Sequence, residues 1–558
     1  MSRNGVDRRN FLKAAGGAAA TASLAGCPIG GNGNGNGEGG GGTLVYARGD
    51  HPENYDPQQT TSGEVAKVTN QMFDTLIQFK AGSGGELEAG LAEDWSLDGQ
   101  TVTLTLREGV TFHNGEEFTA SDFKATFRRF TDADYEYYLG NDNRSGYGPF
   151  TLGNWVESVD ASSDYELELS LTQQYAPMLR NLAMFAAAVL SKAQIEGLDD
   201  QVSLGTEPVG TGPFEFGSLN NSDQRVRLDA SEDFWGPGPN VDEVVFKTIQ
   251  QNSTRVQEVI NGSSHITDNL DADGFKEAQD ADTAELVRKN GINQGYMAMN
   301  MARKEEFRDR NVRLAVSYAV NTEVIVNDIY QGFAAQSDQP TPPDVLGHND
   351  DLDPYPTDKQ RAQELLAEAG YEDGFEMELA TFSNPRGYNP SPIQTANQVK
   401  SDLEDVGITV SINQFESFTP YLEYTSQGQH DACFLGWYTD NADPDNFLYV
   451  LCDPKVAIED VPAGQDWVSF DTEGYSTLNV SGWANTEFME MVRNAQKTYE
   501  NSAREATYEE ANKLVHDEAP WVFIDYAETL RAINEAVVAD SYTISSVGGP
   551  YLNTGEIE

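Results

Sequence analysis

The sequence predicts a two-lobed α/β fold in which mixed sheets with flanking helices are joined by a hinge. The chain has 558 residues, more than the roughly 250–300 that one hydrophobic core usually serves. Apolar residues make up 39% of it, enough to build folded cores. Strand-like and helix-like segments alternate along most of its length, as in sheets covered by helices. We place the first lobe at residues 43–291 and 519–558, and the second at residues 292–518.

The first 27 residues have the composition of an export signal. A basic stretch precedes an Ala-rich apolar run that is shorter than the roughly 20 residues needed to cross a bilayer. Arg8-Arg9 resembles the pair of a twin-arginine signal, and Leu24-Ala25-Gly26-Cys27 resembles a lipobox. The alternative is a chance arginine pair and an ordinary cysteine. We expect lipidation at Cys27, a flexible Gly/Asn-rich tether at residues 28–42, and anchoring at the extracellular face of the cell membrane.

The charge excludes several classes of partner. With 90 acidic and 36 basic residues, the formal net charge is −54. Such a chain repels nucleic acids and anionic lipid surfaces, so we expect no nucleic acid partner. We also expect a monomer. The acidity is spread along the chain and resembles that of proteins from salt-loving archaea, where salt shortens the Debye length to about 3 Å at 1 M.

The first lobe contains short strands and helices. Residues 101–106 alternate apolar and polar positions and predict a strand, and residues 244–249 predict another. Thr119 can cap a helix between them. The apolar face of this helix holds Phe123, Phe127 and Phe130.

The second lobe begins with a series of helices. Asp309 and Asn321 can each cap one. A further helix over residues 358–369 should end at Gly370, because glycine readily takes the left-handed conformation that closes many helices.

Three strand-like runs separated by helix-like runs then predict a βαβαβ unit with parallel strands. The expected strands are residues 375–382, 408–415 and 432–437, and the expected helices are residues 394–406 and 418–425. The last strand is almost continuously apolar, as in a sheet covered on both faces.

Two opposite charges follow strands of this unit. Arg386 comes after the first strand and Asp440 after the third. Ligands of such sheets bind beyond the carboxyl ends of the strands, so both side chains should face one crevice. Trp437, at the end of the third strand, either walls the ligand pocket or belongs to the core.

Signatures of enzymes are missing from the sequence. No His-Glu-x-x-His, Cys-x-x-Cys, phosphate-binding loop or Gly-x-Ser-x-Gly elbow occurs. Asp440, Asp443 and Asp445 are spaced closely, but they lack the central Gly and terminal Glu of an EF-hand loop. We therefore expect no catalytic residue, metal site or cofactor. Cys433 and Cys452 can form one disulfide or remain as two buried thiols.

The segment from Gly436 to Phe447 resembles the family of extracellular solute-binding proteins of peptide and nickel ABC importers (family 5). Further blocks extend the resemblance over almost all of residues 43–558, and those around Arg386 and Asp440 are more specific to its dipeptide-binding branch. They are Leu44-Val45-Tyr46, Thr61-Ser62-Gly63, Leu106 to His113, Gly210 to Phe214, Asp309 to Ala315 and Arg386 to Pro390.

The resemblance implies a periplasmic-binding-protein-like clamp. In it, Asp440 would hold the α-ammonium of a peptide and Arg386 its carboxylate. Thr61, Ser62 and Gly63 would supply main-chain contacts from the opposite lobe, and Tyr388 would line the pocket. The list of expected ligand-binding residues is therefore Asp440, Arg386, Tyr388, Trp437, Thr61, Ser62 and Gly63.

Some positions depart from the family pattern. Ala47, Ser264 and Ala484 replace cysteines of the family's disulfides, which leaves Cys452 without its family partner. Gly387 replaces the usual proline after the arginine, which would loosen that loop.

We expect a substrate-binding lipoprotein of an ABC importer that delivers short peptides, dipeptides foremost, to the permease subunits. The rivals are another solute of the family, such as a longer oligopeptide, an oligosaccharide or a nickel complex, and, from another class, a secreted α/β hydrolase. The hydrolase would need a nucleophile, and the sequence shows none.

Overall fold

The computed structural model describes residues 41–558, and the export signal, Cys27 and most of the tether lie outside that range. The first lobe is built around a seven-stranded sheet of order β12-β19-β11-β1-β10-β9-β8. Strand β1 is parallel to β10 and β11, and the other pairs are antiparallel. The strands are β1 (Thr43–Arg48), β8 (Phe214–Asn220), β9 (Arg225–Ala230), β10 (Glu243–Thr248), β11 (Ile266–Thr267), β12 (Ala284–Lys289) and β19 (Thr529–Asn534).

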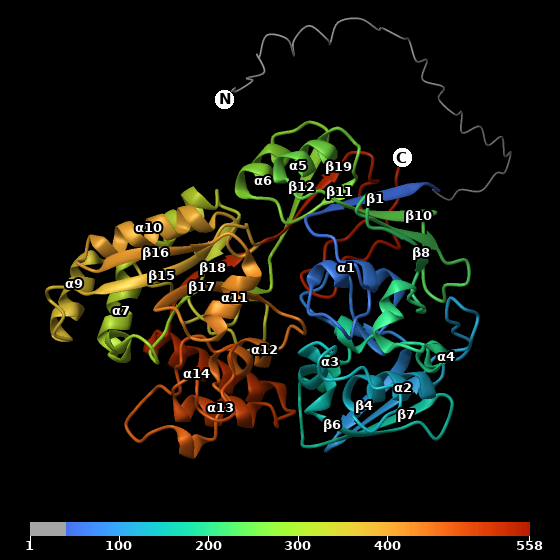
Figure 1. Ribbon diagram of the computed structural model, residues 1–558, viewed down its shortest axis with the longest axis horizontal. Helices are drawn as coiled ribbons and strands as arrows, with labels where there is room; N and C mark the ends of the chain where they lie inside the picture. Colours follow the sequence, from blue (N-terminus) through green and yellow to red (C-terminus); the bar gives the residue numbers. More distant parts are fainter. Residues whose placement is uncertain (1–40) are drawn as a thin grey trace, which may run out of the picture. The chain divides into compact units, whose positions relative to one another are not determined.

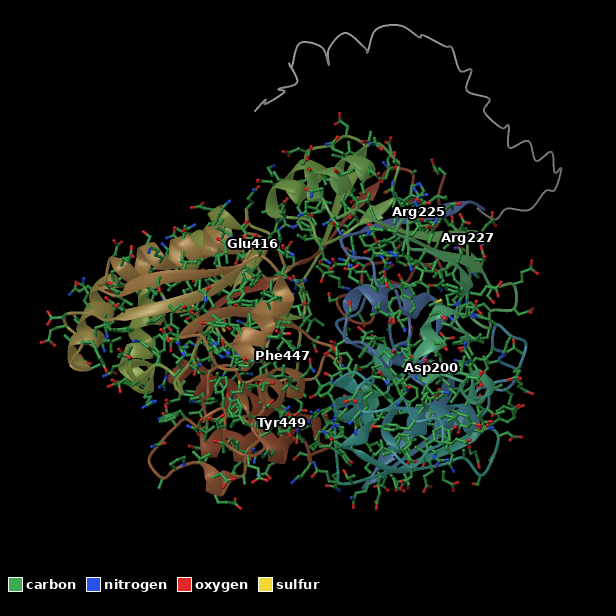
Figure 2. The ribbon with its side chains drawn as sticks, in the orientation of Figure 1. Asp200, Arg225, Arg227, Glu416, Phe447 and Tyr449 are labelled. Carbon is green, nitrogen blue, oxygen red and sulfur yellow. The ribbon has the colours of Figure 1, made fainter. Side chains whose placement is uncertain are left out.

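Strand β9 shows why these segments form a sheet with one covered face. Val226 and Leu228 are fully buried, whereas Arg225 and Arg227, which alternate with them, are exposed (Figure 2). This alternation is the period of two that a half-buried strand requires.

A second part of the first lobe contains a four-stranded sheet of order β4-β5-β7-β6 and a two-stranded sheet, β2-β3. The strand predicted at residues 101–106 is confirmed as β5. The strands are β2 (Ile77–Phe79), β3 (Leu87–Ala89), β4 (Ala92–Asp98), β5 (Thr101–Leu106), β6 (Val156–Asp160) and β7 (Glu166–Leu171).

The helices of the first lobe include the one predicted after Thr119. The Thr119 amide donates to Asp122 Oδ2 at 2.9 Å, and the three predicted phenylalanines of α2 are buried. The helices are α1 (Gly63–Met72), α2 (Ala120–Thr131), α3 (Met178–Asn181), α4 (Lys192–Gly197), α5 (Asn252–Ile260) and α6 (Ala272–Gln279).

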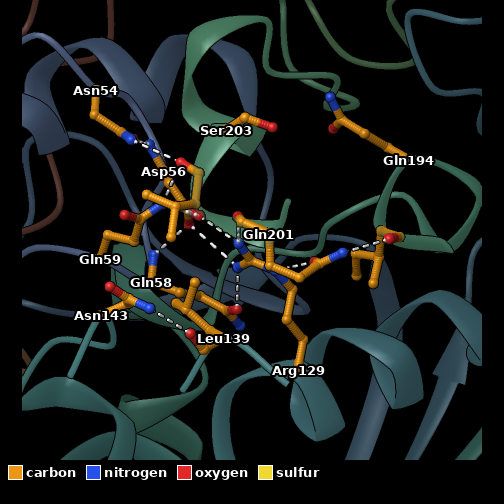
Figure 3. A network of polar contacts seen from close by, with 12 residues as sticks. Asn54, Asp56, Gln58, Gln59, Arg129, Leu139, Asn143, Gln194, Gln201 and Ser203 are labelled. Atoms are coloured by element: carbon orange, nitrogen blue, oxygen red, sulfur yellow. Dashed lines mark hydrogen bonds and ion pairs between the residues drawn. The ribbon is translucent and has the colours of Figure 1, made fainter. Parts of the chain in front are cut away.

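A buried ion pair joins α2 to the loop after β1 (Figure 3). Arg129 Nη2 lies 2.6 Å from Asp56 Oδ2, and neither side chain is exposed. The remaining guanidinium donors reach Gln58 Oε1 at 2.7 Å and the Gln201 side-chain and main-chain oxygens at 2.9 and 2.7 Å. Protein partners therefore satisfy the guanidinium donors and the carboxylate of this buried pair.

The second lobe is built around a six-stranded sheet of order β14-β18-β13-β17-β15-β16 (Figure 1). The predicted βαβαβ unit is confirmed, since β15 is parallel to both β16 and β17. The other pairs are antiparallel. The strands are β13 (Asn293–Met299), β14 (Ala334–Gln336), β15 (Glu376–Phe382), β16 (Thr409–Phe415), β17 (Ala432–Tyr438) and β18 (Trp521–Ala527).

The predicted helix caps of the second lobe are confirmed. Asp309 Oδ1 accepts from the Asn311 amide at 2.8 Å, and Asn321 Oδ1 accepts from the Val324 amide at 3.1 Å. Gly370 has φ of +84° after α9. The helices are α7 (Arg310–Ala319), α8 (Thr322–Val324), α9 (Lys359–Glu368), α10 (Pro392–Glu404), α11 (Phe418–Ser426), α12 (Asp445–Phe447), α13 (Thr486–Ala495) and α14 (Asn501–Glu518).

Two helices differ from their expected form. The helix after Asn321 continues beyond α8 as a π-helical turn, Ile325–Ile329. Helix α10 begins earlier than expected, with Pro392 in its first turn, because proline has no amide hydrogen to lose there.

The sheet topology places the return of the chain to the first lobe later than the boundary expected at residue 519. Strand β18 pairs with β13 and β14 of the second lobe, and only β19 returns to the first lobe. All seven residues of β18 are buried, so this strand requires a covered position inside a sheet. The chain therefore crosses between lobes at Glu528 and, earlier, between β12 and β13.

Candidate ligand-binding cleft

A cleft of about 1730 Å³ is lined by residues of both lobes. Typical small-molecule pockets measure about 300–1,000 Å³, so this one is large. All seven residues expected to bind ligand line it: Asp440, Arg386, Tyr388, Trp437, Thr61, Ser62 and Gly63.

The topology of the second-lobe sheet brings together the loops that carry Arg386 and Asp440. Strands β15 and β17 are adjacent and parallel, so the loops that carry Arg386 and Asp440 leave the same edge. The sheet order, which the sequence did not fix, makes these two strands direct neighbours.

Asp440 presents an unsatisfied carboxylate oxygen. Its Oδ1 accepts a hydrogen bond from the Tyr147 hydroxyl of the first lobe at 2.5 Å. Its Oδ2 has neither solvent contact nor a hydrogen-bond partner among the described residues, although the residue as a whole is partly exposed. Burial raises the pKa of the Asp440 carboxyl to about 7, and the Tyr147 bond lowers it only in part. A positive charge beside this carboxylate would lower its pKa and favour the ionised form.

Asn446 fixes the loop that carries Asp440. Its Oδ1 accepts from Trp437 Nε1 at 2.7 Å and from the Asp440 amide at 3.2 Å. Trp437 packs against two hydrophobic cores and also borders the cleft, and its role toward a ligand stays a prediction.

Arg386 presents the complementary charge. Its guanidinium carbon lies 3.9 Å from the Phe418 ring centroid, and its Nε has no partner in residues 41–558. Two main-chain hydrogen bonds of 2.9 Å between Arg386 and Asn389 close the loop. The cation is therefore positioned by stacking and loop geometry, with its donors available to an anion.

The Tyr438 side chain approaches Gly387 closely. A Cβ there would lie 1.8 Å from the Tyr438 hydroxyl oxygen, so the proline of the family pattern would require the Tyr438 side chain to move. Tyr438 is 41% exposed and lines the cleft. Tyr388 itself is buried against Gly436, where a Cβ would lie 2.2 Å from the Tyr388 ring. The expected loosening of the loop is thus offset by the packing of two tyrosines.

The opposite wall contains the first turn of α1. Ser62 Oγ caps this helix by accepting from the Glu64 amide at 3.2 Å. Because the hydroxyl serves the cap, the main chain of Thr61 to Gly63 is what this wall offers a ligand.

Sequence reasoning missed the contacts from the first lobe. Besides Tyr147, Asn181 Oδ1 accepts from Asn441 Nδ2 at 2.8 Å, and Arg180 Nη1 donates to the Asn441 carbonyl at 3.3 Å. Nothing local to these residues signals partners some 260–290 positions away.

The aspartates near Asp440 have separate partners. Asp443 pairs with Arg504 at 2.8 Å, and Asp445 Oδ2 accepts from the Tyr175 hydroxyl at 3.3 Å. Within residues 41–558, no group of His, Cys, Asp or Glu is arranged to hold a metal ion. Cys433 and Cys452 are both buried and free, so of the two alternatives the structure has the thiols. No helix in the same range is long and apolar enough to cross a membrane.

Two α/β lobes that enclose a charged cleft define a class, the two-lobed solute-binding proteins. Residues 86–457 match the model of bacterial extracellular solute-binding proteins, family 5 Middle, and the chain belongs to this family. It is a transport binding protein and not an enzyme.

The similar proteins bind different solutes. The dipeptide-binding protein of Escherichia coli (strain K12) is 29% identical over 532 residues, covering 92% of this chain and 95% of the relative. Heme-binding protein A of Haemophilus influenzae is 28% identical, covering 86% of each chain. The periplasmic binding protein DppA of Helicobacter pylori, solved with the peptide STSA, has a TM-score of 0.79 at 31% identity, covering 93% of this chain and 99% of that one.

Proposed function

We propose that this protein captures short peptides, dipeptides foremost, outside the cell and delivers them to the permease subunits of an ABC importer. The observation that carries the proposal is the pair of unsatisfied charges on adjacent loops, Asp440 and Arg386. A peptide is a zwitterion, so its ammonium and carboxylate can satisfy both. The Helicobacter relative's complex with the four-residue peptide STSA supports a short peptide as the solute.

The size of the cleft also supports longer peptides as a second candidate. Its volume of about 1730 Å³ leaves room beyond a dipeptide, and a longer chain would use Asp440 without Arg386. Titration with di-, tri- and tetrapeptides separates the candidates, because only a dipeptide binder loses affinity steadily with each added residue.

The raised pKa of Asp440 predicts that binding depends on pH. An α-ammonium stabilises the carboxylate, so the unliganded protein must release a proton below about pH 7 before it binds. Affinity for a free dipeptide should fall by up to about tenfold per pH unit below this value. Above about pH 7.7 the peptide amine itself loses its proton, so affinity should be highest near neutrality.

Calorimetry from about pH 5 to 8, in buffers of different ionisation enthalpy, measures this proton release. The stability of the unliganded fold should change in the opposite sense. A folded-state pKa raised above the ordinary value gives stability that is full at low pH and lost as pH rises through about 7. Equal affinity for a free dipeptide at about pH 5 and pH 8 would show that Asp440 does not bind the ammonium.

We also propose a lipid anchor at Cys27, export by the twin-arginine route and a surface suited to high salt. The proposal is supported by Leu24-Ala25-Gly26-Cys27 and the net charge of −54. Cys27→Ser should release the protein from the membrane fraction while it still binds peptides, because the lobes lie beyond the tether. Fractionation followed by immunoblotting measures this. A variant that stays in the membrane fraction would place the anchor elsewhere.

A further inference from the structure

Lys455 is a cation in the wall of the cleft. It follows the π-helical turn Leu448–Cys452 and has φ of +62°, a left-handed conformation that residues other than glycine rarely adopt. Asp453 stabilises this conformation, because its Oδ1 accepts from the Lys455 amide at 2.6 Å. The backbone at this position is therefore held by a specific contact.

The acidic residues near Lys455 have other partners. Asp453 receives two hydrogen bonds of 2.7 Å from Arg493. Asp445 influences Lys455 electrostatically but forms no ion pair with it. The ammonium lies 5.1 Å from the centroid of the Tyr449 ring. No carboxylate between residues 41 and 558 pairs with Lys455, and burial lowers the pKa of its ammonium.

Lys67, the other lysine that lines the cleft, has carboxylate partners. Lys67 pairs with Glu64 at 2.6 Å and with Asp268 at 2.7 Å. In a chain with 90 acidic and 36 basic residues, carboxylates are abundant partners. A cleft lysine without one is therefore available to an anionic group of the ligand.

Shared hydrophobic packing associates Lys455 with the Asp440 end of the cleft. Tyr147, which donates to Asp440, has its ring 6.0 Å from that of Phe150. Phe150 and Tyr449 pack against the same two hydrophobic cores, and both line the cleft with Lys455. Arg386, by contrast, lies against Phe418 of α11.

We propose that Lys455 binds the acidic side chain of the first ligand residue, so that the protein prefers peptides beginning with Asp or Glu. This inference rests on the proposed function and adds a third charged anchor beside Asp440 and Arg386. A net charge of −54 repels acidic peptides at long range. A preference for them therefore requires a local cation.

Calorimetric titration with Glu-Ala and Gln-Ala tests the inference, because the two peptides differ only in the charge of the first side chain. We expect Glu-Ala to bind about 10-fold more tightly, the usual range for a charge-assisted contact. In Lys455→Gln the ratio should fall to about one, and Lys455→Arg should restore it. Lys497→Gln, an exposed lysine outside the cleft, should retain the ratio.

Ala-Glu and Ala-Gln test the position of the contact. A preference for Ala-Glu that exceeds the preference for Glu-Ala would overturn the placement at the first residue. An unchanged ratio in Lys455→Gln, with an unchanged thermal unfolding midpoint, would overturn the role of Lys455. If Gln-Ala binds but no acidic preference exists, only this inference fails. If no peptide binds, the proposed function fails with it.

Discussion

Asp440→Asn is expected to weaken the binding of free dipeptides by roughly 30-fold to several thousand-fold. Removing one partner of a desolvated charge pair typically costs about 2 to 5 kcal/mol of binding free energy. The fold should tolerate the change, because asparagine has the shape of the protonated aspartic acid that burial already favours. Its amide oxygen can still accept from Tyr147. Isothermal calorimetry with a free dipeptide measures the loss.

Two controls isolate the charge. N-acetylated dipeptides lack the ammonium, so they should bind weakly to both proteins and show little difference between them. Asp445→Asn is a matched variant, because Asp445 is a buried carboxyl whose pKa, like that of Asp440, is raised to about 7 by burial, and it lies outside the cleft. It should leave affinity unchanged. If Asp440→Asn retained full affinity for a free dipeptide, Asp440 would be an ordinary charge worth under about 1 kcal/mol.

Arg386→Gln gives the complementary result. Its loss of affinity should depend on the peptide carboxylate, so amidated dipeptides should bind the variant and the native protein alike. The expected effect is again about 2 to 5 kcal/mol for free dipeptides.

The second large effect is on stability. Arg129→Met should lower the free energy of unfolding by about 3 to 5 kcal/mol, because it leaves the buried Asp56 carboxylate without its partner. Chemical denaturation followed by circular dichroism measures this.

Arg128→Met is the matched control on the same helix. Arg128 is 39% exposed and pairs with Asp132 at 2.8 Å, and its guanidinium carbon lies 4.2 Å from the Tyr135 ring centroid. Exposed pairs of this kind contribute about 1 kcal/mol or less. Equal loss of stability in the two variants would show that burial adds nothing to the Arg129 pair.

Local patterns predicted most elements of the second lobe. Strands β15, β16 and β17 and helices α10 and α11 lie within two residues of their expected ends, because hydrophobic period and caps act over a few residues. The boundary at residue 519 could not be predicted in this way. A short apolar run such as β18 suits either lobe, and only its pairing with β13 and β14 decides between them.

For the site, the sequence by itself determined which residues carry opposite charge at one sheet edge, Asp440 and Arg386. The parallel βαβαβ unit puts both charges after carboxyl ends of strands, because right-handed crossovers keep the strands parallel, but it does not decide which strands are neighbours. Only the tertiary structure decided what surrounds them. The Tyr147 bond to Asp440 and the close approach of Tyr438 to Gly387 join segments that are distant in the chain. The absence of a carboxylate partner for Lys455 depends on neighbours from several elements. The free energy of a charged group depends on its burial and on its hydrogen-bond and ion-pair partners, and both are properties of the packed fold.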